Sequence, residues 1–100
     1  LNLQRVQEFR MELKGKELNR LRGLAHHLKP IVTVGSAGVT AAVKNELENA
    51  LTQHELVKIR LPAMPKADKK HALTDLCAAT AAVEIQIIGR VGVVYRPLQS

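Results

Sequence analysis

The sequence predicts an α/β domain in which helices pack on a partly parallel sheet. Three observations support this prediction. Apolar residues alternate along the chain between helical and strand spacing, the last two predicted strands are separated only by Gly89-Arg90, and 100 residues suffice for a single core. Strands that alternate with helices tend to pair in parallel, whereas a hairpin adds an antiparallel pair. The predicted order is helix, strand, helix, strand, helix, strand, strand.

The first predicted helix spans residues 16–29. Its apolar residues recur at steps of three and four, and they are Leu18, Leu21, Leu24, Ala25 and Leu28. Gly23 lies inside this helix, where it costs about 1 kcal/mol relative to Ala and would permit close packing. Pro30 is predicted to end the helix.

A short strand and a second helix are predicted on either side of a glycine turn. Residues 31–34 favour a strand, and their apolar character is most simply explained by a buried one. Thr40 is placed to cap the N-terminus of a helix that runs to about Gln53. The apolar stripe of that helix consists of Val39, Val43, Leu47, Ala50 and Leu51.

The remaining residues predict a strand, a helix and a hairpin. Residues 54–61 alternate as a strand does, and residues 62–65 (Pro-Ala-Met-Pro) form a loop that neither a helix nor a central strand tolerates. Residues 66–80 predict a third helix, which buries Ala72, Leu73, Leu76 and Cys77. Residues 83–88 and 91–96 form the hairpin, and Pro97 closes the folded region.

The composition favours a polyanionic partner. Fifteen Lys and Arg against nine Asp and Glu give a net charge of +6 and a pI near 9.9. With one Phe, one Tyr and no Trp, the chain has little aromatic surface for stacking on bases. One cysteine cannot form an internal disulfide, and no apolar run approaches the ~20 residues that span a bilayer, so a cytoplasmic location is expected.

The sequence predicts neither an enzyme nor a metal site. His26 and His27 are adjacent, so they point in different directions from a helix, and no cysteine pair or carboxylate stands at metal-ligand spacing. No Ser-His-Asp or Cys-His arrangement can be proposed, and Cys77 lies on an apolar stripe. We therefore expect no catalytic residues, no metal, no cofactor and no small-molecule substrate.

The candidate site is the Gly35-Ser36-Ala37-Gly38 turn between the first strand and the second helix. Two glycines allow a close approach, and the helix N-terminus beyond them attracts a phosphate. A G-x-x-G loop of this kind clamps the nucleic-acid backbone in KH domains. The predicted RNA-binding residues are Gly35, Ser36, Ala37, Gly38, Arg20, Arg22, His26, Lys29 and Lys44.

Other basic residues are left open. Lys66, Lys69 and Lys70 form a second basic cluster at the start of the third helix, either as a solubilising helix end or as an RNA contact. Tyr95 is assigned to packing rather than to stacking.

Three motifs together resemble the CRM domain family, and in particular its bacterial single-domain YhbY-type members. They are residues 21–30 (LRGLAHHLKP), residues 34–40 (VGSAGVT) and residues 54–59 (HELVKI), and the closing hairpin also fits. The resemblance covers about residues 11–97, which would form one RNA-binding domain, with residues 1–10 as an extension. It implies a two-layer α+β fold with a four-stranded mixed sheet and three helices, similar to the C-terminal domain of translation initiation factor 3.

The resemblance also implies a protein that binds ribosomal RNA through the glycine loop and assists assembly of the large ribosomal subunit. We expect this protein to be a monomer. Two alternatives remain open at this point. One is a KH-like RNA binder that is not attached to the ribosome, which would prefer single-stranded RNA. The other is a protein-interaction module, in which the glycine loop is only a turn.

Overall fold

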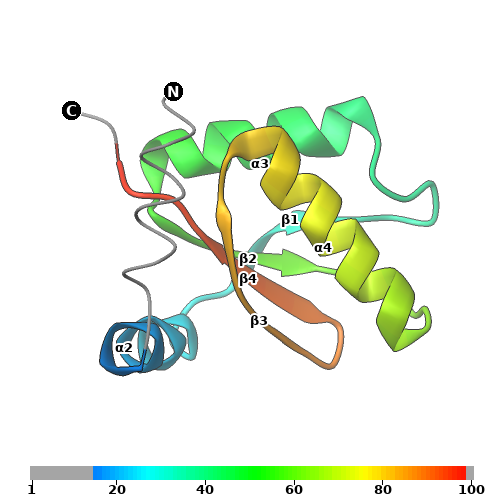
Figure 1. Ribbon diagram of the computed structural model, residues 1–100. Coiled ribbons are helices and arrows are strands. Elements are labelled where there is room, and N and C mark those ends of the chain that lie inside the picture. The colour runs from blue at the N-terminus through cyan, green and yellow to red at the C-terminus, as the bar shows by residue number, and fades with distance from the viewer. Residues whose placement is uncertain (1–14, 99–100) are drawn as a thin grey trace.

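The computed structural model describes residues 15–98 (Figure 1). These residues contain the seven predicted elements in the predicted order. They are α2 (Lys16–Ala25), β1 (Pro30–Thr33), α3 (Ala41–Gln53), β2 (Leu56–Arg60), α4 (Lys66–Thr80), β3 (Val83–Ile88) and β4 (Val91–Tyr95). The proposed extension over residues 1–10 lies outside the described residues.

The four strands form one mixed sheet in the order β1-β2-β4-β3. β1 pairs with β2 in parallel, and β4 is antiparallel to both of its neighbours. The chain crosses over through α3 between β1 and β2, while Gly89-Arg90 join β3 and β4 directly. The predicted sheet, with one parallel pair and a closing hairpin, is confirmed.

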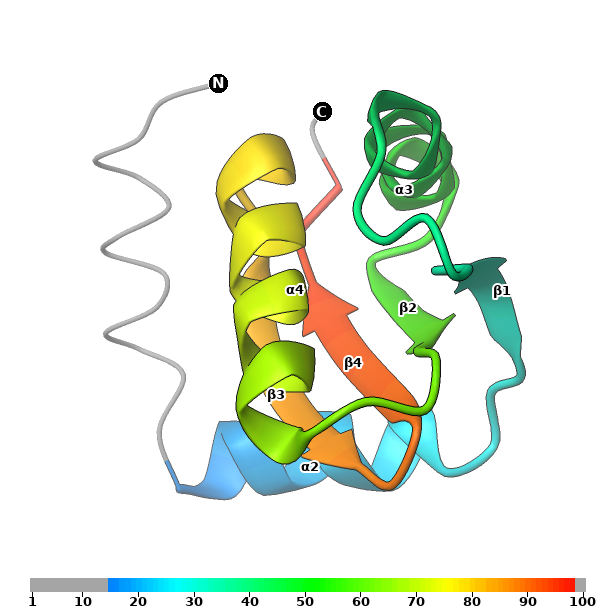
Figure 2. The ribbon, with the colours of Figure 1, turned by 90° about the vertical axis from the view of Figure 1, so that its right-hand side faces the viewer.

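Helices cover both faces of the sheet. α3 and α4 pack against each other and against one face, and their buried residues share a core with Val32, Ile59 and Val94. Among the described helices, α2 is the one on the other face, where Leu21 and Ala25 pack against strand residues (Figures 1 and 2). The sheet is therefore the middle layer of three, whereas the resemblance implied two layers.

The residues that α4 buries follow the predicted stripe, with Leu73 and Leu76 fully inaccessible and Cys77 buried. β4 accommodates this helix with a glycine, because a Cβ atom on Gly92 would lie 2.9 Å from Cδ1 of Leu73. The close contact between α4 and the sheet therefore depends on a missing side chain.

The first helix is shorter than predicted. α2 ends at Ala25, and the N–H groups of His26, His27 and Leu28 donate to carbonyls three residues back in a tighter turn. Leu24 and Leu28 are 48% and 38% exposed, because the sheet face beneath α2 buries only Leu21 and Ala25 fully. The chain leaves the helix once this contact is complete, before it reaches Pro30.

β1 is an edge strand rather than the buried strand that the sequence suggested. Ile31 is 50% exposed, while Val32 is inaccessible and lies in the core beneath α3. An edge position also explains why the strand can begin at a proline, which has no N–H to donate to a neighbouring strand.

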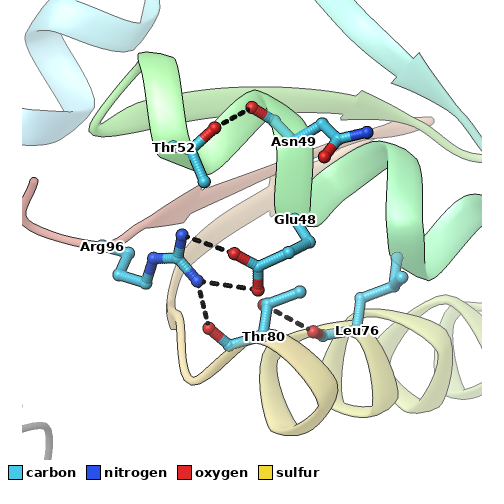
Figure 3. Close-up of polar contacts among 6 residues, drawn as sticks. All are labelled: Glu48, Asn49, Thr52, Leu76, Thr80 and Arg96. Atoms are coloured by element: carbon cyan, nitrogen blue, oxygen red, sulfur yellow. Dashed lines mark hydrogen bonds and ion pairs between the residues drawn. The ribbon is translucent and has the colours of Figure 1, made fainter. Parts of the chain in front are cut away.

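The side chain of Arg96 ties the chain after β4 to α3 through an ion pair and to α4 through a hydrogen bond (Figure 3). The guanidinium of Arg96 donates to both carboxylate oxygens of Glu48 on α3, at 3.0 and 2.9 Å, and to the carbonyl of Thr80 at 2.8 Å. These hydrogen bonds hold the pKa of Glu48 below its usual value. Arg96 thus links the end of β4 to both α3 and α4.

Candidate nucleic-acid interface

Three separate segments meet at one edge of the sheet, which we call the carboxyl edge. Because β1 and β2 are parallel, the loops that follow them, residues 34–40 and 61–65, leave the sheet at the same side. The β3–β4 turn lies there too, since Val91 pairs with both Arg60 and Ile88. Figure 2 looks onto this edge, where the loop before α3, the start of α4 and the β3–β4 turn face the viewer.

The glycine loop is exposed and tightly turned. The N–H of Gly38 donates to the carbonyl of Gly35 at 3.0 Å, and Gly35, Ser36 and Ala37 are all exposed. Gly38 has φ +79°, a left-handed conformation that L residues rarely adopt. Gly35 has no positive φ, and no atom lies within 4 Å of the Cβ position. Of the two loop glycines, only Gly38 has a backbone conformation that favours glycine, and a side chain at position 35 would meet no neighbouring atom.

The helix that follows the loop begins as predicted. The hydroxyl of Thr40 accepts a hydrogen bond from the N–H of Val43 at 3.2 Å, which confirms Thr40 as the N-cap. The first N–H groups of a helix have no acceptor within it, and here they belong to the exposed residues Ala41 and Ala42. An anion at the loop would therefore meet both partial positive charge and free donors.

The start of α4 brings further cations to the carboxyl edge. Lys66, Lys69 and Lys70 lie within its first five residues, with Asp68 as the one acidic residue of the first turn. Cations at a helix N-terminus oppose the helix dipole, at a cost of about 0.3–1 kcal/mol each at low salt. Lys70 forms an ion pair with Glu84, while Lys66 is exposed.

One hydrogen bond ties the start of α4 to the β3–β4 turn, and another ties that turn to the loop that precedes α4. Nζ of Lys69 donates to the carbonyl of Gly89 at 2.9 Å. Nε of Arg90 donates to the carbonyl of Leu61 at 3.1 Å. Lys69 and Arg90 are therefore held in place, and each keeps further N–H donors for a ligand.

The predicted cations of α2 do not lie with the glycine loop. Leu21 and Ala25 pack against Val83, Val93 and Tyr95, on the sheet face that α3 and α4 leave free (Figure 1). Within this helix, Arg20 pairs with Glu17, which lowers the pKa of that carboxyl, and Nη1 of Arg22 donates to Asn19 at 3.3 Å.

The other predicted side chains divide between the two ends of β1. His26 and Lys29 are exposed in the connection before the strand, whereas the glycine loop follows it. Lys44 is exposed one turn into α3, beyond the loop. Of the predicted cations, Lys44 is therefore the one on the element next to the loop.

Residues 15–98 expose no Phe, Tyr or Trp on which a base could stack. Tyr95 is buried in the cluster beneath α2, as its assignment to packing required. Burial, with the nearby carboxylate of Glu55, raises the pKa of its phenol. A ligand at the carboxyl edge would be held by charge and backbone donors.

Residues 15–98 hold neither a cluster of metal-ligating side chains nor a helix that could span a membrane. No group of three or more His, Cys, Asp or Glu side chains in the described chain could hold a metal ion. None of its helices is long and apolar enough to cross a membrane.

Comparison with known proteins decides the family. The model of the CRS1/YhbY (CRM) domain matches residues 13–96. The protein belongs to the CRM domain family. A Haemophilus influenzae relative named as an RNA-binding protein is 40% identical over 85 residues, which cover 85% of this CRM domain chain and 86% of the relative. A probable RNA-binding protein of Pseudomonas aeruginosa is 37% identical over 86 residues, covering 86% of this chain and 83% of its own.

A solved structure supports the fold of this CRM domain. The solution structure of a Staphylococcus aureus protein, described as a candidate RNA binder, superposes with a TM-score of 0.78 at 31% identity. The match covers 87% of this chain and 91% of the other. The α+β fold with a mixed four-stranded sheet is thus shared with a relative.

Sequence reasoning did not identify the basic residues that lie at the same edge of the sheet as the glycine loop of this CRM domain. Arg60 and Arg90 were not candidates, and the lysines of α4 were left open, yet all lie at the carboxyl edge with the loop. The sequence pattern that could have revealed them is the strand–helix–strand order, which is typical of parallel strands. The strands at 30–33 and 56–60 do pair in parallel, so the loops that follow them leave the sheet on the same side.

Proposed function

We propose that this CRM domain binds RNA and that the Gly35–Gly38 loop contacts the sugar–phosphate backbone. The observation that carries the proposal is an exposed loop, turned by a left-handed glycine, directly before the N-terminus of α3. Backbone N–H groups and the helix dipole attract a phosphate there, and small residues let it come close. The names of the relatives and the net charge of +6 support the same partner.

We propose contact with the backbone of structured RNA rather than base-by-base reading. Sequence-specific reading of single strands relies on unstacked bases that stack mainly on aromatic side chains, and residues 15–98 expose no Phe, Tyr or Trp. Double-stranded RNA is instead recognised largely through its shape, phosphates and 2′-hydroxyls. Binding should therefore depend strongly on salt and weakly on sequence.

The biological RNA that we propose is ribosomal RNA in precursors of the large subunit, where the protein would assist assembly as a cytoplasmic monomer. The support for this finer step is the family resemblance together with the basic surface. A role without catalysis agrees with a site made of a glycine loop and cations.

Substitution of Gly35 tests the loop contact without damage to the turn. Gly35→Asp places a negative charge at a position with ordinary φ and open space, and Gly35→Asn adds the same bulk without charge. In a fluorescence-anisotropy titration with a short RNA hairpin, we expect Gly35→Asp to weaken binding at least tenfold, or about 1.4 kcal/mol. Gly35→Asn should weaken it less. Equal affinity of the wild type and Gly35→Asp would remove the loop from the interface.

Gradient sedimentation of cell extract tests the ribosomal part. The wild type should travel with large-subunit precursors, while Gly35→Asp, if folded, should stay at the top. If the wild type stays at the top at low salt but binds the hairpin, RNA binding stands and the ribosome is the wrong partner. Preference for single-stranded RNA would then favour the KH-like alternative. Retention of a protein partner by Gly35→Asp would favour the interaction module.

A further inference from the structure

We propose that the start of α4 is a second phosphate contact, so that RNA lies along the carboxyl edge from the glycine loop to Lys66 and Lys69. This inference deepens the proposed function and rests on it. It assigns a role to the basic cluster that the sequence left open. It also assigns the phosphate contacts to the carboxyl edge and not to the cations of α2.

The first argument is the charge gathered at this edge. The basic residues that border it come from α3, the end of β2, the start of α4 and the β3–β4 turn; they are Lys44, Arg60, Lys66, Lys69 and Arg90. The acidic residue in the first turn of α4 is Asp68 alone. Lys70 is engaged by Glu84 and is left out of the contact. A positive surface assembled from four separate elements fits a polyanion that extends across all of them.

The second argument is that this charge is unfavourable in the free protein. Lys66 is the first residue of α4 and Lys69 the fourth, so both oppose the helix dipole. Pro65 before them has no side-chain acceptor to cap the helix. A bound phosphate would relieve both defects, since it accepts hydrogen bonds from the free N–H groups and neutralises the lysines.

The third argument is that the cations are positioned rather than loose. Lys69 and Arg90 each donate one hydrogen bond to a loop carbonyl, of Gly89 and Leu61 respectively. These bonds orient the side chains beside the α4 start, which reduces the entropy that a ligand contact must overcome. The loop before α3 and the start of α4 lie apart along the same edge of the sheet (Figure 2), so a ligand that contacts both must extend across that edge, as an RNA segment does.

Lys66→Gln is the test, and Lys16→Gln is its matched control. Each lysine is exposed and is the first residue of a helix, so both variants remove the same charge from the same helical position. Lys16 belongs to α2, on the other face of the sheet (Figure 1). The two variants therefore differ mainly in where the charge stands relative to the carboxyl edge.

The measurement is the affinity for the RNA hairpin as a function of salt concentration. Lys66→Gln should weaken binding by about three- to eightfold near 0.1 M salt and make the slope of log affinity against log salt less steep by about 0.7–0.9. Lys16→Gln should leave affinity within about twofold and the slope unchanged. The melting temperature of free Lys66→Gln should not fall, whereas a structural role for Lys66 would lower it.

The outcomes separate this inference from the proposed function. If the wild type binds and Gly35→Asp fails to bind, but Lys66→Gln behaves as Lys16→Gln does, the second contact is wrong and the loop contact stands. If the wild type itself shows no salt-dependent binding to the hairpin, RNA binding is wrong and the second contact with it.

Discussion

At the scale of single residues, the ion pair between Arg96 and Glu48 shows how one buried cation joins three elements. The side chain of Arg96 is 9% exposed, and both its terminal nitrogens are hydrogen-bonded, to Glu48 and to the carbonyl of Thr80. Removal of one partner from a buried pair leaves an uncompensated charge. Glu48 is 45% exposed, so water takes up part of that cost.

Loss of the carboxylate should destabilise the fold. We expect Glu48→Gln to lower the free energy of unfolding by about 1–3 kcal/mol, with each kcal/mol lowering the melting temperature by about 4–8 °C. Glu46→Gln, an exposed carboxylate on the same helix, is the control and should change it by less than about 0.5 kcal/mol. Thermal melts at pH 7 measure both, and equal melting temperatures for the two variants would contradict the account.

The same pair makes stability depend on pH. The pKa of Glu48 is lower in the folded chain than in the unfolded chain, because Arg96 donates to the ionised carboxylate. The contribution is therefore present above the unfolded value of 4.5 and is lost as the pH falls through the folded value. Acid titration should lower the stability of the wild type more than that of Glu48→Gln, and parallel curves would argue against the pair.

The two loop glycines should respond differently to alanine. Gly38→Ala places a Cβ on a residue with φ +79° and should cost about 1–2 kcal/mol. Gly35→Ala meets no strain and no neighbouring atom, so the free energy of unfolding should stay the same or rise by up to about 1 kcal/mol. Urea unfolding of both variants checks this, and an equal loss would mean that the turn is not the one described.

At the scale of elements, the helices show what apolar spacing can and cannot predict. α4 has the predicted bounds, because its apolar stripe is continuous and both of its ends are marked. Pro65 precedes the helix, and Ala81 follows it in a left-handed conformation. α2 ends four residues before the predicted Lys29, since Leu24 and Leu28 continue the spacing without a sheet surface to cover them. Spacing reports which residues could share a face, and only packing decides how far the helix extends.

Two further glycines give opposite predictions within their elements. Gly23 is exposed in α2 with nothing within 4 Å of its Cβ position, so the close packing suggested by the sequence is absent there. Gly23→Ala should raise the free energy of unfolding by about 0.5–1 kcal/mol. Gly92→Ala should lower it by about 1–3 kcal/mol, because the new Cβ would overlap the buried side chain of Leu73. Chemical unfolding measures the change in the free energy of unfolding for both variants. A change of the same sign in both would contradict one of the two predictions.

At the scale of the whole molecule, the strand order is the feature that could not be predicted from the sequence pattern. The glycine loop was predicted from local residues, namely two glycines between a strand and a capped helix. Which segments lie beside that loop depends on the strand order β1-β2-β4-β3, which places the start of α4 and the β3–β4 turn at the same edge of the sheet. Nearness along the chain pointed instead to Arg20, Arg22 and Lys29, which come just before β1 in sequence and lie away from its carboxyl end.

The most direct test of this account is a map of the RNA contact on the folded protein. Titration of the isotopically labelled chain with the RNA hairpin would be followed through the NMR amide signals. We predict that the largest shifts fall on residues 35–42 and 66–70, with small shifts for residues 16–25 of α2. Large shifts on α2 with an unchanged glycine loop would contradict the central claim that the carboxyl edge holds the RNA.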